Sequence, residues 1–424
     1  MAGLKWLLFI FYISVVTFCE LSEDNQEVNQ QSLSKVINDF GCLIFPQLEL
    51  ASGNDKSHKN LIYSPLSITL AISMVYLGAS NTTALEIHNT LFGSQSTGGS
   101  AFHKQWMSLF AAIGINNKQN VDEVNLANGL WFNKKFEQLQ LTYKLELKEY
   151  YDTLIRAVDF SKQESITGIN NWVNLKTGGK IQSIIEEDAV NENTVLILVN
   201  VLFFKSLWKE MFSKEDTYDS EFFINATNAV NVEMMRKKSF YEFFYDRILG
   251  VQVVKLPYVN GTFAMFVALP QEIDSLARIQ KHTTSKQLEM WERSLYHTTL
   301  DVHLPKFIVT ATYDLEQVMK ALGIREVFDM ERANLSGISQ SSLLHVSKFF
   351  HKAFIEVDEQ GTEAAAVSAV HITKRSLDPA FKADHPFIFW IKHIKTQTIF
   401  FLGQIAVPNL KVDHLDTSER HTEF

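Results

Sequence analysis

The chain has 424 residues, 46% of them hydrophobic and 12% aromatic, and a formal net charge of −9. This composition can bury a large core, and a chain of this length usually forms two domains. Pro and Gly are sparse, and no low-complexity run or internal repeat separates two halves, so we expect a single large domain. The negative charge argues against a general nucleic-acid binder and leaves room only for a local basic patch.

The N-terminus has the order of charge and hydrophobicity that is typical of a signal peptide. Lys5 precedes an apolar run from Trp6 to Phe18, which is too short for a comfortable membrane span. We predict cleavage after Cys19, and no second charge-free run of spanning length follows, so no membrane anchor is expected. The predicted organisation is a signal peptide (1–19), a flexible N-terminal segment (20–30), one domain (31–410) and a polar tail (411–424).

Cysteine content and glycosylation sequons fit a secreted protein. Cleavage would leave Cys42 as the only cysteine, so no intrachain disulfide can form, and we expect Cys42 to be a small buried apolar residue. The sequons lie at Asn81, Asn225, Asn260 and Asn334. The last four residues, from His421, resemble an ER-retrieval tetrapeptide with Phe in place of Leu.

Hydrophobic periodicity predicts both helices and strands. Ser67–Tyr76 and Phe102–Ile113 are apolar at spacings of three and four, as amphipathic helices are. Apolar runs predict strands, several of them covered on both faces, at Val195–Phe204, Val253–Leu256, Phe263–Leu269, Leu300–Phe307 and Ile399–Ile405. This mixture predicts an α+β fold with a large central sheet.

The segment EVDEQGTEAAAVSAVHITKRS, residues 356–376, alternates in a way that an ordinary surface loop does not need. Every second residue from Thr362 to Ile372 is small or apolar and suits the inner face of a strand. The poor strand propensity of its first part and the terminal Lys374–Arg375 pair favour an exposed loop instead. We interpret the segment as one that adopts two states. A short alanine-rich helix capped by Thr362 is the competing interpretation, which β-branched Val370 disfavours.

The start of this segment resembles the reactive-loop hinge of the serpin family. The hinge residues are Glu359, Gly361, Thr362, Glu363, Ala364, Ala365 and Ala366, followed by Ser368. Further blocks resemble the family in the same order: NLIYSPLSITLAISMVYLGAS from Asn60, VNLANGLWF from Val124, INNWVNLKTGGKI from Ile169, VLILVNVLFFKSLW from Val195, VVKLPY from Val253, LDVHLPKF from Leu300 and ADHPFIFWI from Ala383. The resemblance covers almost the whole chain after its first 30 or so residues.

The resemblance implies a specific α+β fold. This fold has three β-sheets, eight or nine helices and an exposed C-terminal reactive loop, here at about residues 359–380. Phe349–Val357 would be a central strand that leads directly into the hinge. The native state would be metastable, because the intact loop is tethered at its far end. The narrower resemblance is to secreted inhibitory groups such as neuroserpin, the plasminogen-activator inhibitors and antithrombin.

The function implied by the resemblance is suicide inhibition of a serine protease rather than enzymatic activity. A protease that cuts the loop forms an acyl-enzyme, and insertion of the cut loop into the sheet distorts the protease before water can release it. About 15 residues would insert, spanning about 50 Å at about 3.3 Å per residue. The alternative is a non-inhibitory serpin that acts as a carrier or chaperone. Such members tend to have bulky or charged residues on the inner face of the hinge, and this hinge has none.

The bait bond follows from the usual spacing between the hinge glutamate and the scissile residue, which is sixteen positions and gives Arg375–Ser376 here. An arginine at this position pairs with the carboxylate in the specificity pocket of a trypsin-like protease, which we predict to be the covalent partner. Lys374 is the second candidate. Alternatively, Lys374 and Arg375 only solubilise the loop or form a dibasic processing site, although Ile372 stands where a convertase would need a further basic residue.

Buried polar residues have implied roles as well. Ser64, Ser67, Asn200 and His351 would form a bonded cluster under the centre of the main sheet, where strands must part. Lys306 and Glu359 would form an ion pair at the loop base, and Trp208 would lie at the top of the sheet, where insertion starts. A catalytic role for His351 is disfavoured because it stands alone in a strand-like context.

Signatures of enzymes and cofactor sites are absent from the sequence. We find no Gly-x-Ser-x-Gly elbow, zinc helix, phosphate loop or dinucleotide fingerprint, and we predict no cofactor or metal. His297 and His303 are expected to be exposed polar residues rather than metal ligands.

Basic residues do not form an extended patch in the sequence. The cluster Arg236, Lys237 and Lys238 is assigned to a solvated turn. The helix that carries the glycosaminoglycan site in heparin-binding serpins offers only His103 and Lys104, so glycosaminoglycan binding is not supported. We expect a monomer that binds no nucleic acid and no membrane.

Overall fold

The structure is a computed structural model, and it describes residues 33–50, 59–93, 99–114, 122–136, 139–341, 343–362 and 379–408. The predicted signal peptide (1–19), the N-terminal segment (20–30) and the polar tail (411–424) lie outside the described residues.

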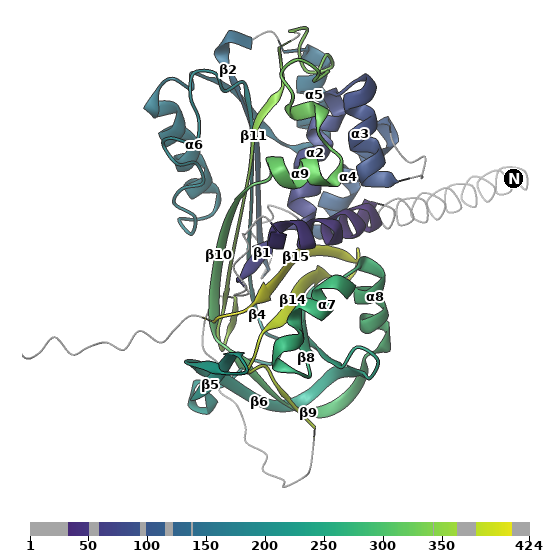
Figure 1. Ribbon diagram of the computed structural model, residues 1–424, viewed down its shortest axis with the longest axis vertical. Coiled ribbons are helices and arrows are strands. Elements are labelled where there is room, and N and C mark those ends of the chain that lie inside the picture. Colours follow the sequence, from purple (N-terminus) through teal and green to yellow (C-terminus); the bar gives the residue numbers. More distant parts are fainter. Residues whose placement is uncertain are drawn as a thin grey trace, which may run out of the picture.

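Two hydrogen-bonded sheets form the centre of the molecule (Figure 1). The first has six strands: β10 (Phe307–Asp314), β11 (Val346–Val357), β4 (Leu196–Leu207), β2 (Glu123–Asn133) and β3 (Leu154–Val158) in this order, with β12 (Gly361–Thr362) on β4. The second has nine: β1 (Leu61–Tyr63), β15 (Thr398–Ile405), β14 (Phe387–His393), β8 (Phe263–Pro270), β7 (Val251–Pro257), β6 (Asn228–Asp246), β9 (Tyr296–Pro305) and β13 (Ala380–Lys382), with β5 (Tyr218–Asn225) on β6.

The α-helices of the described part cover these sheets. They are residues 33–50, α2 (Pro65–Gly78), α3 (Asn81–Phe92), α4 (Ser100–Ile113), α5 (Leu141–Tyr151), α6 (Gln163–Lys176), α7 (Leu276–His282), α8 (Ser285–Ser294) and α9 (Glu316–Leu322). Helix α6 lies on one face of the six-stranded sheet, and α2 to α5 and α9 lie on the other (Figure 1). Helices α7 and α8 pack beside the nine-stranded sheet (Figure 1). This arrangement confirms the predicted α+β fold.

The sheets differ from the expectation in one respect. Three sheets were expected, but β6 runs without a break from Asn228 to Asp246 and pairs with β5, β9 and β7 in turn. Its continuity joins two of the three expected sheets into the nine-stranded one. The predicted strand Leu300–Phe307 is likewise two strands, because β9 ends at Pro305 and β10 begins at Phe307.

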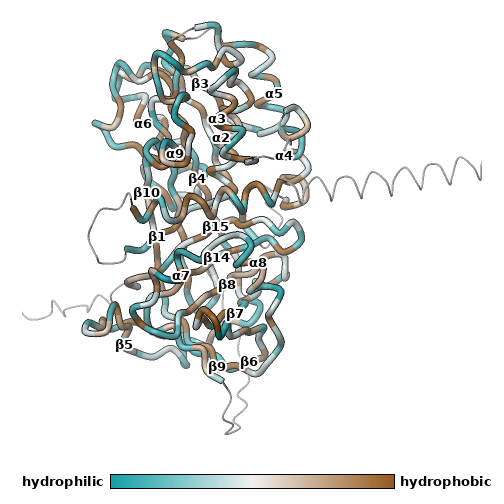
Figure 2. Tube along the Cα trace, turned by 45° about the vertical axis from the view of Figure 1, so that its right-hand side comes forward, coloured by the Kyte–Doolittle hydropathy of each residue, from teal (hydrophilic) through white to brown (hydrophobic). Residues whose placement is uncertain are grey.

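Strand β4 is apolar from Leu196 to Phe204 except at Asn200, and its packing shows why. Its even-numbered residues Leu196, Leu198, Leu202 and Phe204 belong to the main core. Its odd-numbered residues Ile197, Val199 and Val201 belong to a second core under α6. A strand that is covered on both faces needs apolar side chains on both faces. Hydrophobic residues gather in these central strands, whereas the outer loops are mostly hydrophilic (Figure 2).

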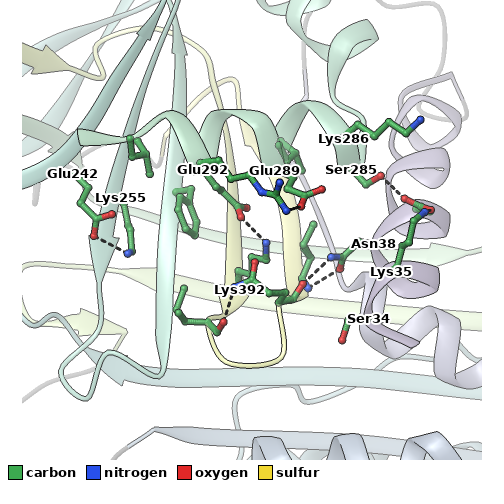
Figure 3. Close-up of a pocket in the computed structure, with 18 residues that line it drawn as sticks. Ser34, Lys35, Asn38, Glu242, Lys255, Ser285, Lys286, Glu289, Glu292 and Lys392 are labelled. Atoms are coloured by element: carbon green, nitrogen blue, oxygen red, sulfur yellow. Dashed lines mark hydrogen bonds and ion pairs between the residues drawn. The ribbon is translucent and has the colours of Figure 1, made fainter. Parts of the chain in front are cut away.

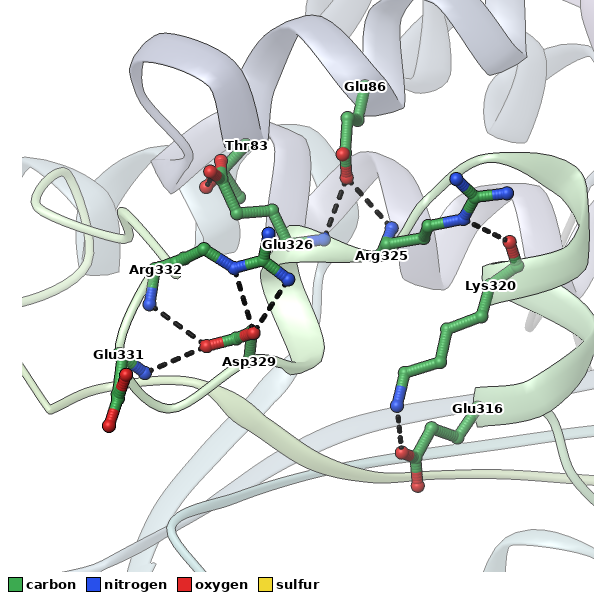
Figure 4. A network of polar contacts seen from close by, with 9 residues as sticks. All are labelled: Thr83, Glu86, Glu316, Lys320, Arg325, Glu326, Asp329, Glu331 and Arg332. Atoms are coloured by element: carbon green, nitrogen blue, oxygen red, sulfur yellow. Dashed lines mark hydrogen bonds and ion pairs between the residues drawn. The ribbon is translucent and has the colours of Figure 1, made fainter.

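The loop after α9 is fastened to α3 (Figure 4). Glu86 Oε2 accepts hydrogen bonds from the backbone N–H groups of Arg325 and Glu326, at 2.8 and 2.7 Å. Thr83 Oγ1 donates to Glu326 Oε2 at 2.7 Å. Because this loop leads into β11, the contacts hold the start of β11 at the end of the molecule where α3 and α5 lie.

Two glycines provide a matched test of this packing. A Cβ on Gly403 of β15 would lie 2.3 Å from the backbone oxygen of Leu61 in the neighbouring strand β1. A Cβ on Gly168 of α6 would have no atom within 4 Å. We expect Gly403→Ala to lower the free energy of unfolding by about 2 kcal/mol. Gly168→Ala should raise it by about 1 kcal/mol, because alanine favours the helix.

Urea unfolding of both variants checks this prediction. Equal midpoints for Gly403→Ala and the wild type would show that β1 and β15 are not packed as described.

Candidate functional site

The hinge enters the six-stranded sheet where two strands separate. Strands β11 and β4 pair in parallel up to Phe354 and Phe203. Beyond this point β12 takes the place beside β4, with Gly361 opposite Leu207 and Thr362 opposite Ser206 in an antiparallel pair. The two described hinge residues, Gly361 and Thr362, therefore form a strand, and the residues of the alternative alanine-rich helix lie outside the described residues.

A tight turn brings the chain back into the sheet. Asp358 Oδ1 accepts hydrogen bonds from the N–H groups of Gln360 and Gly361 at 2.9 and 3.1 Å, and the backbones of Asp358 and Gly361 bond to each other. Gly361 has φ of 135°, and a Cβ there would lie 2.4 Å from the backbone oxygen of Ser206. Only glycine fits this position, because an L side chain would be strained and would collide with β4.

Trp208, which was predicted to lie at the top of the sheet, holds this turn by two hydrogen bonds. Its indole Nε1–H donates to the backbone oxygen of Asp358 at 3.0 Å, and its backbone N–H donates to that of Gln360 at 2.9 Å. The ring stacks on Tyr258 with centroids 4.6 Å apart. Two stacked and buried aromatic rings, Trp208 and Tyr258, therefore hold the turn in place.

The carboxylate of Glu359 fixes the base of the hinge through contacts with Lys306 and Thr217. Its carboxylate lies 3.4 Å from Lys306 Nζ and accepts a hydrogen bond from Thr217 Oγ1 at 2.9 Å. Burial alone would raise the pKa of Glu359, but hydrogen bonds from its own backbone N–H and from Thr217, together with the charge of Lys306, lower it overall. The structure thus brings together the predicted pair Lys306 and Glu359.

The four residues predicted to form a buried cluster do meet. Asn200 Nδ2 donates to the backbone oxygen of Ser67 at 2.7 Å, and Ser67 Oγ donates to Asn200 Oδ1. His351 Nδ1 lies 2.6 Å from the same Oδ1, and the Ser64 N–H donates to His351 Nε2 at 3.1 Å. Asn128 on β2, which we did not single out, joins through a hydrogen bond from Asn200. A buried asparagine in an apolar strand was its signal in the sequence.

These contacts determine the protonation state of His351. Because Nε2 accepts a hydrogen bond from an N–H group, the ring proton must be on Nδ1, which donates to Asn200 Oδ1. Burial lowers the pKa of His351 to about 3. A neutral ring with both nitrogens bonded is a structural group and not a catalytic base.

Many predicted reactive-loop residues lie outside the described residues. These are Glu363, Ala364, Ala365, Ala366, Ser368, Lys374, Arg375 and Ser376. The described hinge ends at Thr362, and the chain is described again from Pro379, which accepts a hydrogen bond from the Asp301 N–H of β9 at 3.1 Å.

The four sequons all lie in the described part. Asn81 at the start of α3 and Asn260 after β7 are exposed, whereas Asn225 and Asn334 are half-buried. The hydroxyl of Thr83, which completes the Asn81 sequon, is buried and bonded to Glu326. Occupancy of the sequons remains a prediction.

A cavity of about 540 Å³ lies between residues 33–50, α8 and the nine-stranded sheet (Figure 3). Four of its charged groups form two ion pairs, Lys392 with Glu292 and Lys255 with Glu242 at 2.7 Å. Glu292 also accepts a hydrogen bond from Trp390 Nε1 at 2.8 Å. No charge in these pairs is left to select an oppositely charged ligand.

Several smaller predictions can be compared with the structure. Cys42 is buried, and burial raises the pKa of its thiol. The basic cluster Arg236, Lys237 and Lys238 is not a turn, which corrects the expectation, because these residues lie in the middle of β6. His303 is half-buried rather than exposed, because Tyr218 covers it.

The described residues contain neither a cluster of metal-ligating side chains nor a helix that could span a membrane. No group of three or more His, Cys, Asp or Glu residues there could hold a metal ion. Within the same residues, no helix combines the length and the hydrophobicity that crossing a membrane requires.

A family model described as serpin (serine protease inhibitor) matches residues 35–408. The chain belongs to the serpin family. Serpin B3 from Homo sapiens is 34% identical over 397 residues, which cover 89% of this chain and 100% of that protein. Leukocyte elastase inhibitor A from Rattus norvegicus is 36% identical over 360 residues, which cover 82% of this chain and 93% of that protein.

Solved serpin structures have the same fold. Human thyroxine-binding globulin in complex with thyroxine matches with a TM-score of 0.81 and 29% identity, covering 90% of this chain and 100% of that one. The relatives thus include one protein named as an elastase inhibitor and one named for binding thyroxine. The narrower resemblance to neuroserpin, the plasminogen-activator inhibitors and antithrombin stays a prediction.

The neutral state of His351 predicts a pH dependence of stability. An unfolded chain takes up a proton at this histidine near its ordinary pKa of 6.5, whereas the folded chain does so only near 3. The stabilising contribution is therefore fully present above pH 6.5 and declines as the pH falls, by about 1.4 kcal/mol per unit.

Urea unfolding between pH 7 and pH 4 measures this contribution, with His351→Gln as the variant and exposed His297→Gln as the control. The wild type and His297→Gln should lose stability more steeply on acidification than His351→Gln. Equal slopes for all three would contradict a buried neutral His351.

Proposed function

We propose that this serpin is a suicide inhibitor of trypsin-like serine proteases, which it traps by inserting its cleaved reactive loop between β4 and β11. One observation carries the proposal: β12 already pairs antiparallel with β4 at the point where β11 leaves it. The hinge thus starts a new strand that the rest of the loop can extend.

The register of β12 defines how the loop would extend. Each further residue of the loop moves one residue back along β4 from the pair Thr362 and Ser206. Ser368 then lies opposite Asn200, and Ile372 lies opposite Leu196, the first residue of β4. The inserting part from Gly361 therefore fills the whole length of β4 and ends just before Lys374–Arg375.

The faces of the inserted strand agree with the alternation in the sequence. Residues directly opposite in a sheet share a face, so Ala364 and Ala366 would face the main core with Phe204 and Leu202. Val367 would face the α6 side with Val201.

Insertion would provide the energy of the trap. Each inserted residue forms about one ladder hydrogen bond worth about 1 kcal/mol net, so a strand of this length gains roughly 10 kcal/mol before apolar burial is added. The intact loop cannot obtain this energy, since Pro379 and Ala380 hold its far end against β9.

The trapping step starts as ordinary proteolysis. The protease serine attacks the carbonyl carbon of Arg375, the peptide bond to Ser376 breaks, and the new amino terminus of Ser376 leaves. Insertion then carries the acyl-linked protease to the opposite end of the molecule before water attacks the ester. The serpin is the substrate in this chemistry, and its own residues catalyse no step.

A carrier function is the second candidate, and the cavity beside α8 favours it (Figure 3). Thyroxine-binding globulin shows that a serpin can bind a small ligand. The hinge argues against a carrier as the main function, because Gly361 and Trp208 already position it for insertion.

We also propose that the protein is secreted and glycosylated. The predicted signal peptide and the exposed sequons at Asn81 and Asn260 support this. Mass spectrometry of protein secreted by transfected cells would test both points.

The bait assignment is tested by gel analysis of mixtures with trypsin, thrombin, plasmin and a plasminogen activator. We expect a denaturant-resistant band at the summed mass with at least one of these enzymes. Arg375→Ala should lower the rate of complex formation by about 100-fold or more, because the guanidinium in the specificity pocket is lost. Lys374→Ala is the matched control and should change the rate little.

Two outcomes would contradict the assignment. If every enzyme cleaves the loop and is released active, the chain is not an inhibitor. If only Lys374→Ala abolishes the complex, the bait bond is Lys374–Arg375.

The register is tested by an arginine on each face of the inserting strand. Thr362→Arg should convert the inhibitor into a substrate that is cleaved without trapping, because its charge would be buried opposite Ser206, which is 1% exposed. Glu363→Arg, on the opposite face, is the control. The measurement is the ratio of complex to cleaved serpin, and normal trapping by Thr362→Arg would show that the faces are reversed.

A further inference from the structure

A buried polar pair lies beside the first hinge residue, and the inhibitory mechanism derived above assigns no role to it. Ser206 Oγ of β4 donates a hydrogen bond to Oδ1 of Asp122, which directly precedes β2. Ser206 is 1% exposed and Asp122 is 7% exposed. Burial of a carboxylate is costly, and apolar side chains would fill the same space without that cost. The cost indicates that the pair does more than fill space.

The pair belongs to a row of polar residues across three strands. Glu123 pairs with Lys205, so Asp122 is in register with Ser206 on one side of β4. On the other side of β4, Thr362 of β12 pairs with Ser206. Residues that are directly opposite one another share a face of the sheet. We call Asp122, Ser206 and Thr362 the entry row.

Asp122 determines the direction of hydrogen bonding in the entry row. An ionised carboxylate only accepts hydrogen bonds, so the single hydroxyl proton of Ser206 is directed to Asp122. The Ser206 oxygen therefore has only lone pairs for the strand on its other side. Cβ atoms of directly opposite residues lie about 5 Å apart, which lets two hydroxyl groups meet. A side chain opposite Ser206 would be bound if it donates a hydrogen bond and repelled if it only accepts.

The hinge offers one such donor at the right place. The hinge sequence GTEAAAV, which begins at Gly361, contains a single hydroxyl group, that of Thr362. A slip of one residue in one direction would place Gly361, which has no side chain, opposite Ser206. A slip in the other direction would place the carboxylate of Glu363 there, close to the charge of Asp122. Because a one-residue slip turns every side chain of a strand to the other face, this pair decides the register of the whole inserted strand.

We propose that Asp122 and Ser206 are positioning residues that set the register of the reactive loop as it inserts. They do so by accepting a hydrogen bond from Thr362 and rejecting the residues on either side of it. This inference rests on the proposed inhibitory function. It adds a requirement to the hinge, since residue 362 must donate a hydrogen bond as well as be small. Correct pairing at the first step shortens the time in which water can release the protease, so the entry row raises the yield of trapped protease.

The test measures the ratio of cleaved serpin to covalent complex with the trypsin-like protease that the wild type inhibits fastest. Thr362→Val keeps the shape of the side chain and removes the donor, so this ratio should rise about tenfold. Thr362→Ser keeps a donor and should behave like the wild type. Thr310→Val is the matched control, because Thr310 is an exposed threonine of β10 in the same sheet. It should leave the ratio unchanged.

Reversal of the entry row separates this role from a merely structural one. Thr362→Asp should be cleaved and hardly trapped, because its carboxylate meets the lone pairs of Ser206 and the charge of Asp122. Adding Asp122→Asn should lower the ratio again by about tenfold, because the amide can donate to Ser206 and Ser206 can then donate to the carboxylate at position 362. This double variant buries one carboxylate in the row, as the wild type does. Asp122→Asn alone should change the ratio little, because its amide oxygen still accepts from Ser206.

The Tm of each variant after cleavage by trypsin provides a second measurement, which does not depend on trapping. Thr362→Val and Thr362→Asp should show a smaller rise in Tm on cleavage than the wild type, and the double variant should regain part of it. Equal ratios for Thr362→Val and Thr310→Val, or no rescue of Thr362→Asp by Asp122→Asn, would overturn the role of the entry row while leaving the inhibitory function intact. Absence of any covalent complex with the wild type would instead overturn the proposed function, and the Tm values would then decide on the entry row alone.

Discussion

Strands β11 and β4 are parallel neighbours along most of their length, and they separate after Phe354 and Phe203. The site depends on this separation. Beyond Phe203, β11 no longer pairs with β4, and an antiparallel strand from the hinge can pair there instead. Gly361 and Thr362 form that pair in the intact protein. In the proposed mechanism, each further loop residue would enter only if β4 and β11 move apart.

The polar cluster under the sheet connects this opening to the core. Asn200 belongs to β4, His351 to β11, and Ser64 and Ser67 to the cap of α2, so parting the strands breaks the contact between His351 and Asn200. Buried polar groups are costly when they lose their partners. Ser368 would arrive at this position, and its hydroxyl can replace the lost contact. In the proposed mechanism, the cluster would therefore oppose the separation of β4 and β11 until Ser368 is inserted.

The sequence predicted the fold class and the strong strands, because both depend on local patterns such as apolar runs covered on two faces. The buried cluster was predicted from the resemblance to the serpin family. The sequence could not predict the fusion of two sheets through β6, which depends on an uninterrupted path between partners far apart in the chain. The turn assigned to Arg236, Lys237 and Lys238 was wrong because distant partners hold this charged run in β6. Lys237 bonds to Met211 and pairs with Glu210, and Arg236 bonds to Asp301. Asn128 was missed because its partner, Asn200, is 72 residues away.

The central claim is that the loop completes the sheet only after it is cut, and thermal unfolding before and after cleavage at the bait bond tests it most directly. Insertion of the whole inner strand should add roughly 10 kcal/mol from hydrogen bonds, which raises the Tm of a domain of this size by about 12 °C, and apolar burial raises it further. Wild-type protein cleaved by trypsin should show this rise, and cleaved Thr362→Arg should not. A cleaved wild type that unfolds at or below the temperature of the intact protein would contradict the account.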